Sequence, residues 1–258
     1  MNYVIAIPSY NRYETLKNKT INYLKKQNIP IENIYIFVAN KEEFDNYKKI
    51  FPEYNVIIGV IGLFNQRNFI CNYFDEETYI ISMDDDIEDI KQKLTDNKKD
   101  NKLISIDLKK FIFEAYEILI SKKMYLWGIN MISNPFYAYK KISFDLRLCL
   151  GTFYGFINRK KMIQINYPQV IGEDIVKTLQ YYIHDGGVVR FNDIILDTKF
   201  YADGGIQSLM NKQNRIENLN QLITILINDF PQFVKRKKNG NYMFVKNPKN
   251  ILNLLIHR

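Results

Sequence analysis

The chain has 258 residues, of which 47% are hydrophobic and 25% are charged. This composition is typical of a folded globular protein and excludes a disordered tail, a collagen-like repeat and a disulfide scaffold. Lysine and arginine number 36 against 28 acidic residues, and the formal net charge of +8 favours an anionic partner such as nucleic acid, a phosphate-bearing substrate or membrane headgroups.

Alternating apolar runs and helical segments fill the first 90 residues. Strands are predicted at 3–7, 33–39, 56–58 and 79–83, and helices at 14–27, 41–50 and 66–74. Such alternation is typical of a doubly wound α/β sheet, in which ligands bind at the carboxyl ends of the strands. The fourth strand ends there in three consecutive aspartates, Asp84, Asp85 and Asp86.

The pattern changes after residue 90. Residues 91–101 are almost wholly polar and are predicted to form an exposed loop. Helices are then predicted at 107–122, 174–183 and 211–230, strands at 125–129, 144–150, 153–157 and 188–191, and a basic turn at 234–241. Because these strands largely lack intervening helices, we expect a mixed or antiparallel extension of the first sheet.

Cysteine spacing and apolar run lengths bear on the compartment. Cys71 and Cys149 lie far apart, which favours neither a zinc cluster nor a secreted disulfide framework. The apolar run at 3–7 is too short for a signal peptide, and no run approaches the ~20 residues of a membrane span. We therefore expect a protein of the reducing cytoplasm with no membrane partner.

The three aspartates need a physical explanation, because carboxylates packed this closely repel one another unless a cation or hydrogen bonds offset their charge. In an extended segment Asp84 and Asp86 point one way and Asp85 the other. The pair Asp84 and Asp86 can then bind a Mg²⁺ or Mn²⁺ ion that also binds a diphosphate. In the alternative interpretation, one of the aspartates caps a helix beginning at Glu88.

Several short motifs follow one another in the order found in GT-A glycosyltransferases. They are Pro8-Ser9-Tyr10-Asn11-Arg12, Asn65-Gln66-Arg67-Asn68, Asp84-Asp85-Asp86, Trp127-Gly128-Ile129-Asn130, Asn134-Pro135, Gly151-Thr152-Phe153-Tyr154-Gly155, Gly172-Glu173-Asp174 and Gly204-Gly205-Ile206. More narrowly, the chain resembles the glycosyltransferases associated with thymine- and methylcytosine-oxidising dioxygenases of the TET and JBP type. That group includes the base J glucosyltransferase of kinetoplastids and many phage relatives.

The resemblance covers about residues 1–207 and implies an α/β GT-A fold, a mainly parallel mixed central sheet with flanking helices. Residues 1–207 would form the catalytic domain, with a nucleotide-binding half at about 1–90 and an acceptor half at about 125–207. Residues 208–258 would be a helical and basic extension of the same domain.

A donor site for a nucleotide-sugar, with a UDP-sugar expected, is also implied. Its candidate residues are Pro8, Ser9, Asn11, Arg12, Arg67, Asp84, Asp85, Gly151 and Thr152. An arginine suits a diphosphate or a uracil edge because its planar guanidinium donates several hydrogen bonds; the alternative for both arginines is a surface charge near a helix start. A Mn²⁺ or Mg²⁺ ion is expected on Asp86, Asp84 and Asp203.

The Gly172-Glu173-Asp174 segment resembles the acceptor-side acidic motif of inverting enzymes. Asp174, with Glu173 beside it, would be the general base that takes a proton from the acceptor hydroxyl as this attacks the anomeric carbon. In the alternative interpretation the aspartate is a helix N-cap and Glu173 complements the helix dipole. His184 is expected on the helix that follows.

Basic residues recur beside aromatic ones in the acceptor half. Candidate acceptor or DNA contacts are Trp127, Asn134, Tyr154, Lys140, Lys141 and Lys237. Lysines track phosphates and aromatic side chains can stack on an extruded base, although most charge runs are solvated faces. The favoured acceptor is a 5-hydroxymethyl pyrimidine in phage or viral DNA. The alternatives are a polysaccharide or protein acceptor, and a DNA-binding protein without catalysis.

Overall fold

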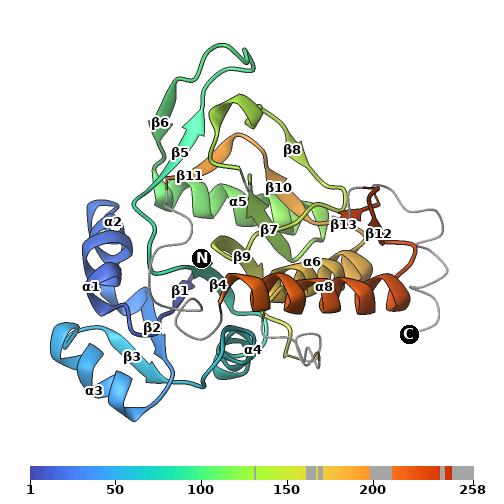
Figure 1. The fold of residues 1–258 in the computed structure, drawn as a ribbon. Coiled ribbons are helices and arrows are strands. Elements are labelled where there is room, and N and C mark those ends of the chain that lie inside the picture. The colour runs from blue at the N-terminus through green and yellow to red at the C-terminus, as the bar shows by residue number, and fades with distance from the viewer. Residues whose placement is uncertain (131, 161–166, 168–170, 198–210, 239–241, 246–258) are drawn as a thin grey trace.

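A central sheet of eight strands, in the order β3-β2-β1-β4-β9-β7-β10-β8, organises the part of the chain that the structure describes (Figure 1). The computed structural model describes residues 1–130, 132–160, 167, 171–197, 211–238 and 242–245. The strands are β1 (Tyr3–Pro8), β2 (Ile34–Val38), β3 (Asn55–Ile58), β4 (Tyr79–Met83), β7 (Leu126–Ile129), β8 (Ile142–Ser143), β9 (Phe153–Ile157) and β10 (Val189–Phe191).

Strands β1 to β4 are parallel and form the first half of the sheet. Strand β1 pairs with both β2 and β4, and β2 pairs with β3. The β-branched side chains of Ile5 and Ile7 in β1 have no exposed surface. A continuous apolar run of this kind is what a parallel strand needs when both faces of the sheet are covered. The predicted alternation of strands and helices in this half is confirmed.

The second half of the sheet is mixed. Strand β9 is antiparallel to β4 and to β7, whereas β10 is parallel to β7. Strands β4, β7 and β10 therefore run in the same direction, and their carboxyl ends share one edge of the sheet with the beginning of β9. We call this edge the carboxyl edge. The short strand β8 pairs antiparallel with β10 at the border of the sheet.

Helices cover both faces of the sheet (Figure 1). On one face lie α1 (Tyr13–Leu16), the π-helical η1 (Lys17–Ile21), α2 (Asn22–Lys26), the 3-10 helix η2 (Ile31–Asn33), α3 (Lys41–Ile50) and α5 (Leu108–Lys122). On the other face lie α4 (Leu63–Tyr73), α6 (Glu173–Asp185) and α8 (Lys212–Asp229). Within the described ranges, no helix has the length and apolar character needed to span a membrane.

The predicted helices are largely confirmed. Those expected at 107–122, 174–183 and 211–230 end within two residues of α5, α6 and α8. The helix expected at 14–27 is present but divided, because five of its residues form the π-helical turn η1. His184 lies on α6, as expected.

Two smaller sheets accompany the central one. Strands β5 (Asp89–Lys93), β6 (Leu103–Ser105) and β11 (Ile194–Asp197) form an arm at the top of Figure 1, and β12 (Val234–Arg236) pairs with β13 (Tyr242–Phe244). The predicted loop at 91–101 is wrong in its first three residues, which belong to β5. Lys93 shows why, since its side chain is fully buried and its ammonium donates to the Pro135 carbonyl at 2.8 Å.

The strand predicted at 144–150 is wrong. The described chain pairs with the outer side of β10 only through Ile142 and Ser143 of β8, and the pairing stops before residue 144. The apolar side chains of Leu146 and Leu148 are buried in irregular chain instead. A short apolar run does not reveal whether a partner strand is long enough to pair with it.

Candidate active site

Four segments meet at the carboxyl edge: the loop after β1, the turn after β4, the turn before β9 and the first turn of α6. The backbone N–H of Asp84 donates to the Thr152 carbonyl at 2.9 Å. The N–H of Gly151 donates to Asp174 Oδ2 at 3.1 Å. One turn of two residues therefore connects the aspartates that follow β4 with the acidic pair that begins α6.

A buried threonine shapes the turn after β4. Thr20 of η1 has no exposed surface; its hydroxyl donates to the Asp84 carbonyl at 2.8 Å and accepts from the Ile87 N–H at 2.9 Å. Residues 84–88 lead directly into β5 without a helix. The interpretation of an aspartate as the cap of a helix beginning at Glu88 is therefore wrong.

Asp85 points into the protein, whereas Asp84 and Asp86 keep 31% and 14% of their side chains exposed. Asp85 accepts a hydrogen bond from Ser9 Oγ at 2.6 Å and pairs with the guanidinium of Arg12 at 2.9 Å. Burial raises the pKa of Asp85 to about 7, and Arg12 and Ser9 act against that shift. The expected alternation is therefore observed: the side chain of Asp85 is buried, whereas those of Asp84 and Asp86 are partly exposed.

The guanidinium of Arg12 bridges two of the aspartates. Its two terminal nitrogens lie 2.9 Å from Asp85 and 3.0 Å from Asp86. The backbone N–H of Arg12 donates to Tyr47 Oη at 3.0 Å, and its Nε is buried with no hydrogen-bond partner in the described chain. Only 12% of the side chain is exposed, so the interpretation as a surface charge is wrong.

The buried side chain of Arg67, in α4, contacts strand β4, the turn after β4 and the turn before β9. Its guanidinium donates to Ser82 Oγ, to Asp84 Oδ1 at 2.8 Å and to the Gly151 carbonyl at 2.8 Å. Only 2% of the side chain is exposed. Arg67 is therefore neither a surface charge nor a direct contact of a donor phosphate, and both expectations are corrected. It is a positioning residue that holds the turn before β9 against Asp84.

Glu173 and Asp174 occupy the first turn of α6. The N-cap is Gly172, whose φ of +91° lies in the left-handed region that favours glycine, so the interpretation of Asp174 as the N-cap is wrong. Asp174 accepts from the N–H groups of Gly151 and Ile175. Glu173 is 7% exposed and lies 4.0 Å from the guanidinium of Arg67.

Both carboxyl groups have raised pKa values. Burial raises the pKa of Glu173 to about 7, and the adjacent Asp174 adds to the shift. Burial also raises the pKa of Asp174, while the hydrogen bonds from Gly151 and Ile175 oppose the rise. A raised pKa makes a carboxylate a stronger base, so such a group is better suited to accept a proton from a substrate hydroxyl.

The other predicted donor residues line the same edge. Pro8 ends β1, and Asn11 is exposed in the following loop with a φ of +56°. Thr152 Oγ1 is buried and has no hydrogen-bond partner in the described chain. A Cβ atom at Gly151 would lie 3.1 Å from Glu173 Oε1, so the turn packs closely against α6.

Asp84 and Asp86 are the candidate ligands for a divalent cation. One or two carboxylates completed by phosphate oxygens and water form the usual protein site for Mg²⁺, so these two side chains fit that group. Within the described ranges, no three His, Cys, Asp or Glu side chains are grouped to hold a metal ion. Asp203, the expected third ligand, lies outside the described residues.

We call the five carboxylates and two arginines of this edge the acid-rich cluster. Its members are Asp84, Asp85, Asp86, Glu173, Asp174, Arg12 and Arg67. Carboxylates outnumber guanidinium groups, so the cluster has an excess of negative charge that a cation would offset.

Two of the expected acceptor contacts are core residues. Trp127 has no exposed surface and packs against Phe111 and Phe153 with ring centroids 5.4 and 5.3 Å apart. Tyr154 is 2% exposed, and its hydroxyl accepts a hydrogen bond from the ammonium of Lys177 at 3.3 Å. Their assignment as DNA contacts is therefore wrong, because neither ring has surface to offer a base.

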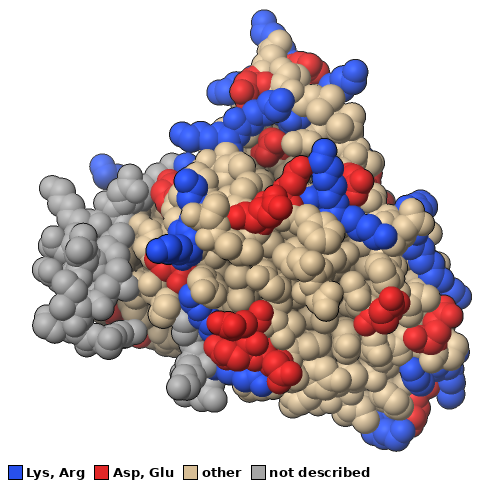
Figure 2. Space-filling view, turned by 180° about the vertical axis from the view of Figure 1, so that it is seen from behind, with Lys and Arg blue, Asp and Glu red and all other residues tan. Residues whose placement is uncertain are grey.

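The remaining expected contacts, Asn134, Lys140, Lys141 and Lys237, are exposed. Asn134 accepts from the Phe136 N–H at 3.0 Å and so begins the 3-10 helix η3 (Pro135–Tyr137). On the face turned away from the viewer of Figure 1, basic side chains are interspersed with acidic ones and do not form a continuous stripe (Figure 2).

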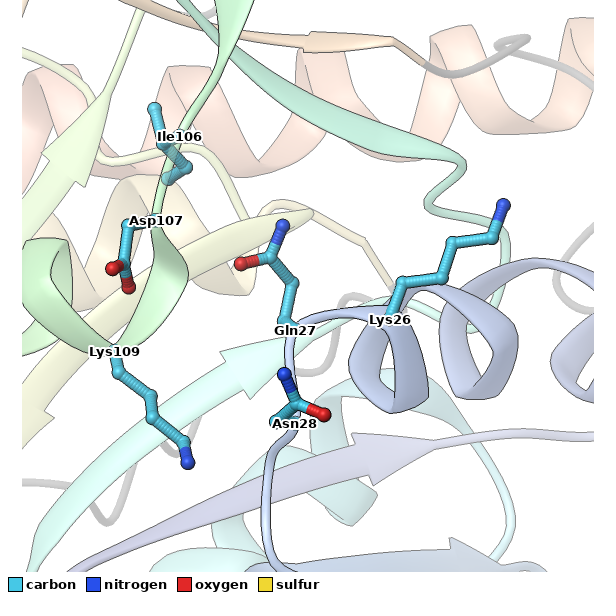
Figure 3. Close-up of a pocket in the computed structure, with 6 residues that line it drawn as sticks. All are labelled: Lys26, Gln27, Asn28, Ile106, Asp107 and Lys109. Carbon is cyan, nitrogen blue, oxygen red and sulfur yellow. The ribbon is translucent and has the colours of Figure 1, made fainter.

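A polar pocket lies between the end of α2 and the start of α5 (Figure 3). Its lining residues are Lys26, Gln27, Asn28, Ile106, Asp107 and Lys109, none of which belongs to the acid-rich cluster. Gln27 accepts from the Leu108 N–H at 2.9 Å, and Asp107 accepts from the Lys110 N–H at 3.0 Å. These two side chains cap the start of α5, so they have a structural role.

Sequence reasoning missed three residues that shape the site. Tyr47 shares a 2.7 Å hydrogen bond with Ser9 Oγ, Glu43 accepts from the Asn11 N–H at 2.8 Å, and Thr20 holds the turn after β4. A signal existed for Thr20, because it lies on the apolar stripe of its helix between Leu16 and Leu24. The other two contacts arise from helix α3, which is remote in sequence.

The sequence of the chain matches the model of a known protein family. A family model described as TET-associated glycosyltransferase matches residues 3–205. No curated protein matches the chain.

Two solved structures share the fold. One is S. aureus TarS 1–349 in complex with UDP, with a TM-score of 0.50 and 15% identity over 88% of this chain. The other is GalNAc-T7 with UDP, GalNAc and Mn²⁺, with a TM-score of 0.50 and 12% identity over 89% of this chain. This chain spans 66% of the first and 50% of the second.

Both neighbours are GT-A glycosyltransferases, so the predicted GT-A fold is confirmed. The family model covers most of the chain, including every segment of the acid-rich cluster. The chain therefore belongs to the TET-associated glycosyltransferase family and has the GT-A fold.

Proposed function

We propose that the enzyme moves a sugar from a nucleotide-sugar, with a UDP-sugar as expected donor and a divalent cation as cofactor, to the hydroxyl of a 5-hydroxymethyl pyrimidine in DNA. The observation that carries this proposal is the Gly151–Thr152 turn, which is hydrogen-bonded to Asp84 on one side and to Asp174 on the other. A donor diphosphate beside the first and an acceptor hydroxyl beside the second would meet over this turn.

On the donor side, Arg12 and Thr152 would bind the nucleotide-sugar. Arg12 Nε and Thr152 Oγ1 have no hydrogen-bond partner in the described chain, so each has a donor to offer a phosphate or sugar oxygen. The UDP in both neighbours, and the Mn²⁺ in one, support this class of donor and cofactor. A divalent cation held by Asp84 and Asp86 would stabilise the negative charge of the departing diphosphate.

On the acceptor side, Asp174 would be the general base. It would take the hydroxyl proton as the oxygen attacks the anomeric carbon, while the bond to the diphosphate breaks and its electron pair leaves with the diphosphate. A single displacement of this kind inverts the anomeric configuration. Burial keeps the pKa of Asp174 above its usual range and so makes it a stronger base, and the N–H of Gly151 orients it.

Three features support DNA as the acceptor. The family is described as associated with TET, the chain carries a net charge of +8, and the loop after β7 exposes lysines beside aromatic rings. Lys140 and Lys141 are exposed, and Phe136 and Tyr137 are 44% and 54% exposed. Lysines attract phosphates, and exposed rings can stack on bases.

The test is mass spectrometry of nucleosides from DNA that contains hydroxymethylcytosine or hydroxymethyluracil. The DNA is incubated with the protein, Mn²⁺ and a panel of sugar nucleotides. We expect a sugar adduct on one of the two bases, and its loss with Asp174→Asn. Glu114→Gln is the matched control, because Glu114 is an exposed acid of α5.

No adduct on either base, together with transfer to a polysaccharide or protein acceptor, would overturn the DNA assignment and leave the enzyme a glycosyltransferase. Adduct formation that is unchanged by Asp174→Asn would overturn the assignment of the base.

A further inference from the structure

Arg190 of β10 is a buried cation that makes no ion pair with the residues that the structure describes. The residue is 9% exposed, and among the described residues its side chain makes one hydrogen bond, from a terminal nitrogen to Asn130 Oδ1 at 3.1 Å. Its Nε is buried and has no hydrogen-bond partner, and no carboxylate of the described chain lies within 4.0 Å. Burying a guanidinium without an ion pair is unfavourable, and an anion from outside the described chain would offset that cost.

A second guanidinium lies beside it. Arg147 donates to Asp145 at 2.7 Å and to Tyr139 Oη at 2.8 Å, and 21% of its side chain is exposed. Burial lowers the pKa of Arg190, and Arg147 lowers it further, while Cys149, Tyr139 and Asp145 act against this shift. We call Arg147, Arg190, Asn130, Tyr139 and Asp145 the arginine-rich cluster. Two guanidinium groups here face one carboxylate.

The arginine-rich cluster lies on the same edge of the sheet as the active site. Arg190 is the second of three residues in β10, and Asn130 directly follows β7. Strand β10 is three positions from β4 in the sheet, which corresponds to about 14 Å at the usual strand spacing. Cys149, beside Arg190, precedes the Gly151 turn by two residues. An anion here would lie on the same edge of the sheet as the proposed reacting groups without occupying the donor site.

Asn130 connects the cluster to the exposed aromatic rings. Its amide donates to the Tyr137 carbonyl at 3.2 Å, while its carbonyl oxygen accepts from Arg190. The rings of Phe136 and Tyr137 are 5.1 Å apart, and the ammonium of Lys98 lies 5.5 Å from the centre of the Phe136 ring. An anion site with a lysine and exposed aromatic rings nearby suits a nucleic acid strand better than a free anion, because a strand offers both phosphates and bases.

We propose that Arg190, together with Arg147, binds a backbone phosphate of the acceptor DNA strand. This inference rests on the proposed function, since it takes DNA to be the acceptor. Phosphate contacts fix the register of a nucleic acid on a protein without reading its sequence. The site would hold the strand while the target hydroxyl reaches Asp174.

The test measures binding, so it does not depend on turnover. A fluorescein-labelled duplex with one 5-hydroxymethyl pyrimidine is titrated with wild type, Arg190→Met and Arg147→Gln at a series of NaCl concentrations. We expect Arg190→Met to weaken binding about tenfold and to reduce the slope of log affinity against log salt by about 0.9. Lys26→Gln is the control for charge alone, since Lys26 lies in the separate pocket of Figure 3.

A parallel titration with UDP separates the two possible sources of phosphate. UDP affinity should be unchanged in Arg190→Met; if it falls while DNA binding is unchanged, the anion is the donor diphosphate and the inference is overturned. Circular dichroism checks that Arg190→Met folds. If it does not fold, Arg147→Gln carries the test, because 21% of the Arg147 side chain is exposed; we then expect a smaller loss in the same direction.

The outcomes separate this inference from the proposed function. A wild-type salt slope in a folded variant, with transfer to DNA intact, overturns the inference alone. A reduced slope without any transfer to DNA by the wild type supports the site and overturns the proposed acceptor. If the wild type does not bind DNA, both are wrong.

Discussion

The acid-rich and arginine-rich clusters use the same kinds of side chain in opposite proportions. In the first, Arg12 and Arg67 face five carboxylates. In the second, Arg147 and Arg190 face one, Asp145. Both clusters lie on the carboxyl edge of one sheet. The local balance of charge, and not the type of residue, therefore indicates whether a cation or an anion completes each site.

This contrast also explains the net charge of +8. The excess positive charge does not lie in the acid-rich cluster, where carboxylates outnumber guanidinium groups. It lies in the loop after β7, in β10 and in lysines on the surface. Substitutions that change one cluster and leave the other intact can test the comparison.

The largest effect is expected from Asp174→Asn in the acid-rich cluster. Removal of the general base should lower kcat for sugar transfer about 10³-fold, because the amide cannot take the hydroxyl proton. The affinities for UDP and for DNA should stay within a factor of two or so of wild type. Steady-state kinetics and the two titrations measure this, and a large change in DNA affinity would contradict the separation of the clusters.

The second largest effect is expected from Asp86→Ala. The rate of sugar transfer in the presence of Mn²⁺ should fall about 10²-fold or more, because a cation held by one carboxylate stabilises the departing diphosphate less well. The Mn²⁺ concentration needed for half-maximal rate should rise. Glu114→Gln, which removes an exposed acid from α5, should change neither quantity. Mn²⁺ titrations of the initial rate provide the measurement, and an unchanged titration curve would remove Asp86 from the cation site.

Arg67→Met should destabilise the fold by about 3 kcal/mol, because it leaves Asp84 and the buried Glu173 without their shared guanidinium. The measurement is urea unfolding. Arg190→Met should cost much less, since Arg190 has no carboxylate partner within ion-pair distance in the described chain. Equal losses of stability in the two variants would contradict the proposed difference in charge balance.

A smaller effect concerns pH. The pKa of Glu173 is raised from 4.5 to about 7 in the folded protein, so the folded state binds this proton more tightly than the unfolded state. Its contribution to stability is complete below about pH 4.5 and is lost as the pH rises through about 7. Glu173→Gln should remove about 1–3 kcal/mol of that pH dependence, measured as the free energy of unfolding at pH 5 and pH 8. An unchanged profile would show that Glu173 stays charged.

Most of the architecture was predictable because local patterns determine it. The buried strands, the amphipathic helices and the carboxyl ends of the strands are all read from spacing, and the three aspartates mark the site. The incorrect predictions also have physical reasons. The segment 144–150 is as apolar as a strand, but whether it forms one depends on the length of β10, more than 35 residues further along.

The sequence by itself determined the fold class, the family resemblance and which acidic residues meet at the carboxyl edge of the sheet. It did so because these features are carried by short motifs in a fixed order. Only the tertiary structure decided how exposed each side chain is and what it contacts. It buries Trp127 and Tyr154, places the buried guanidinium of Arg67 between Asp84 and the turn before β9, and leaves Arg190 without an ion pair to any described residue. Burial and charge balance depend on residues brought together from distant parts of the chain, and no local pattern contains them.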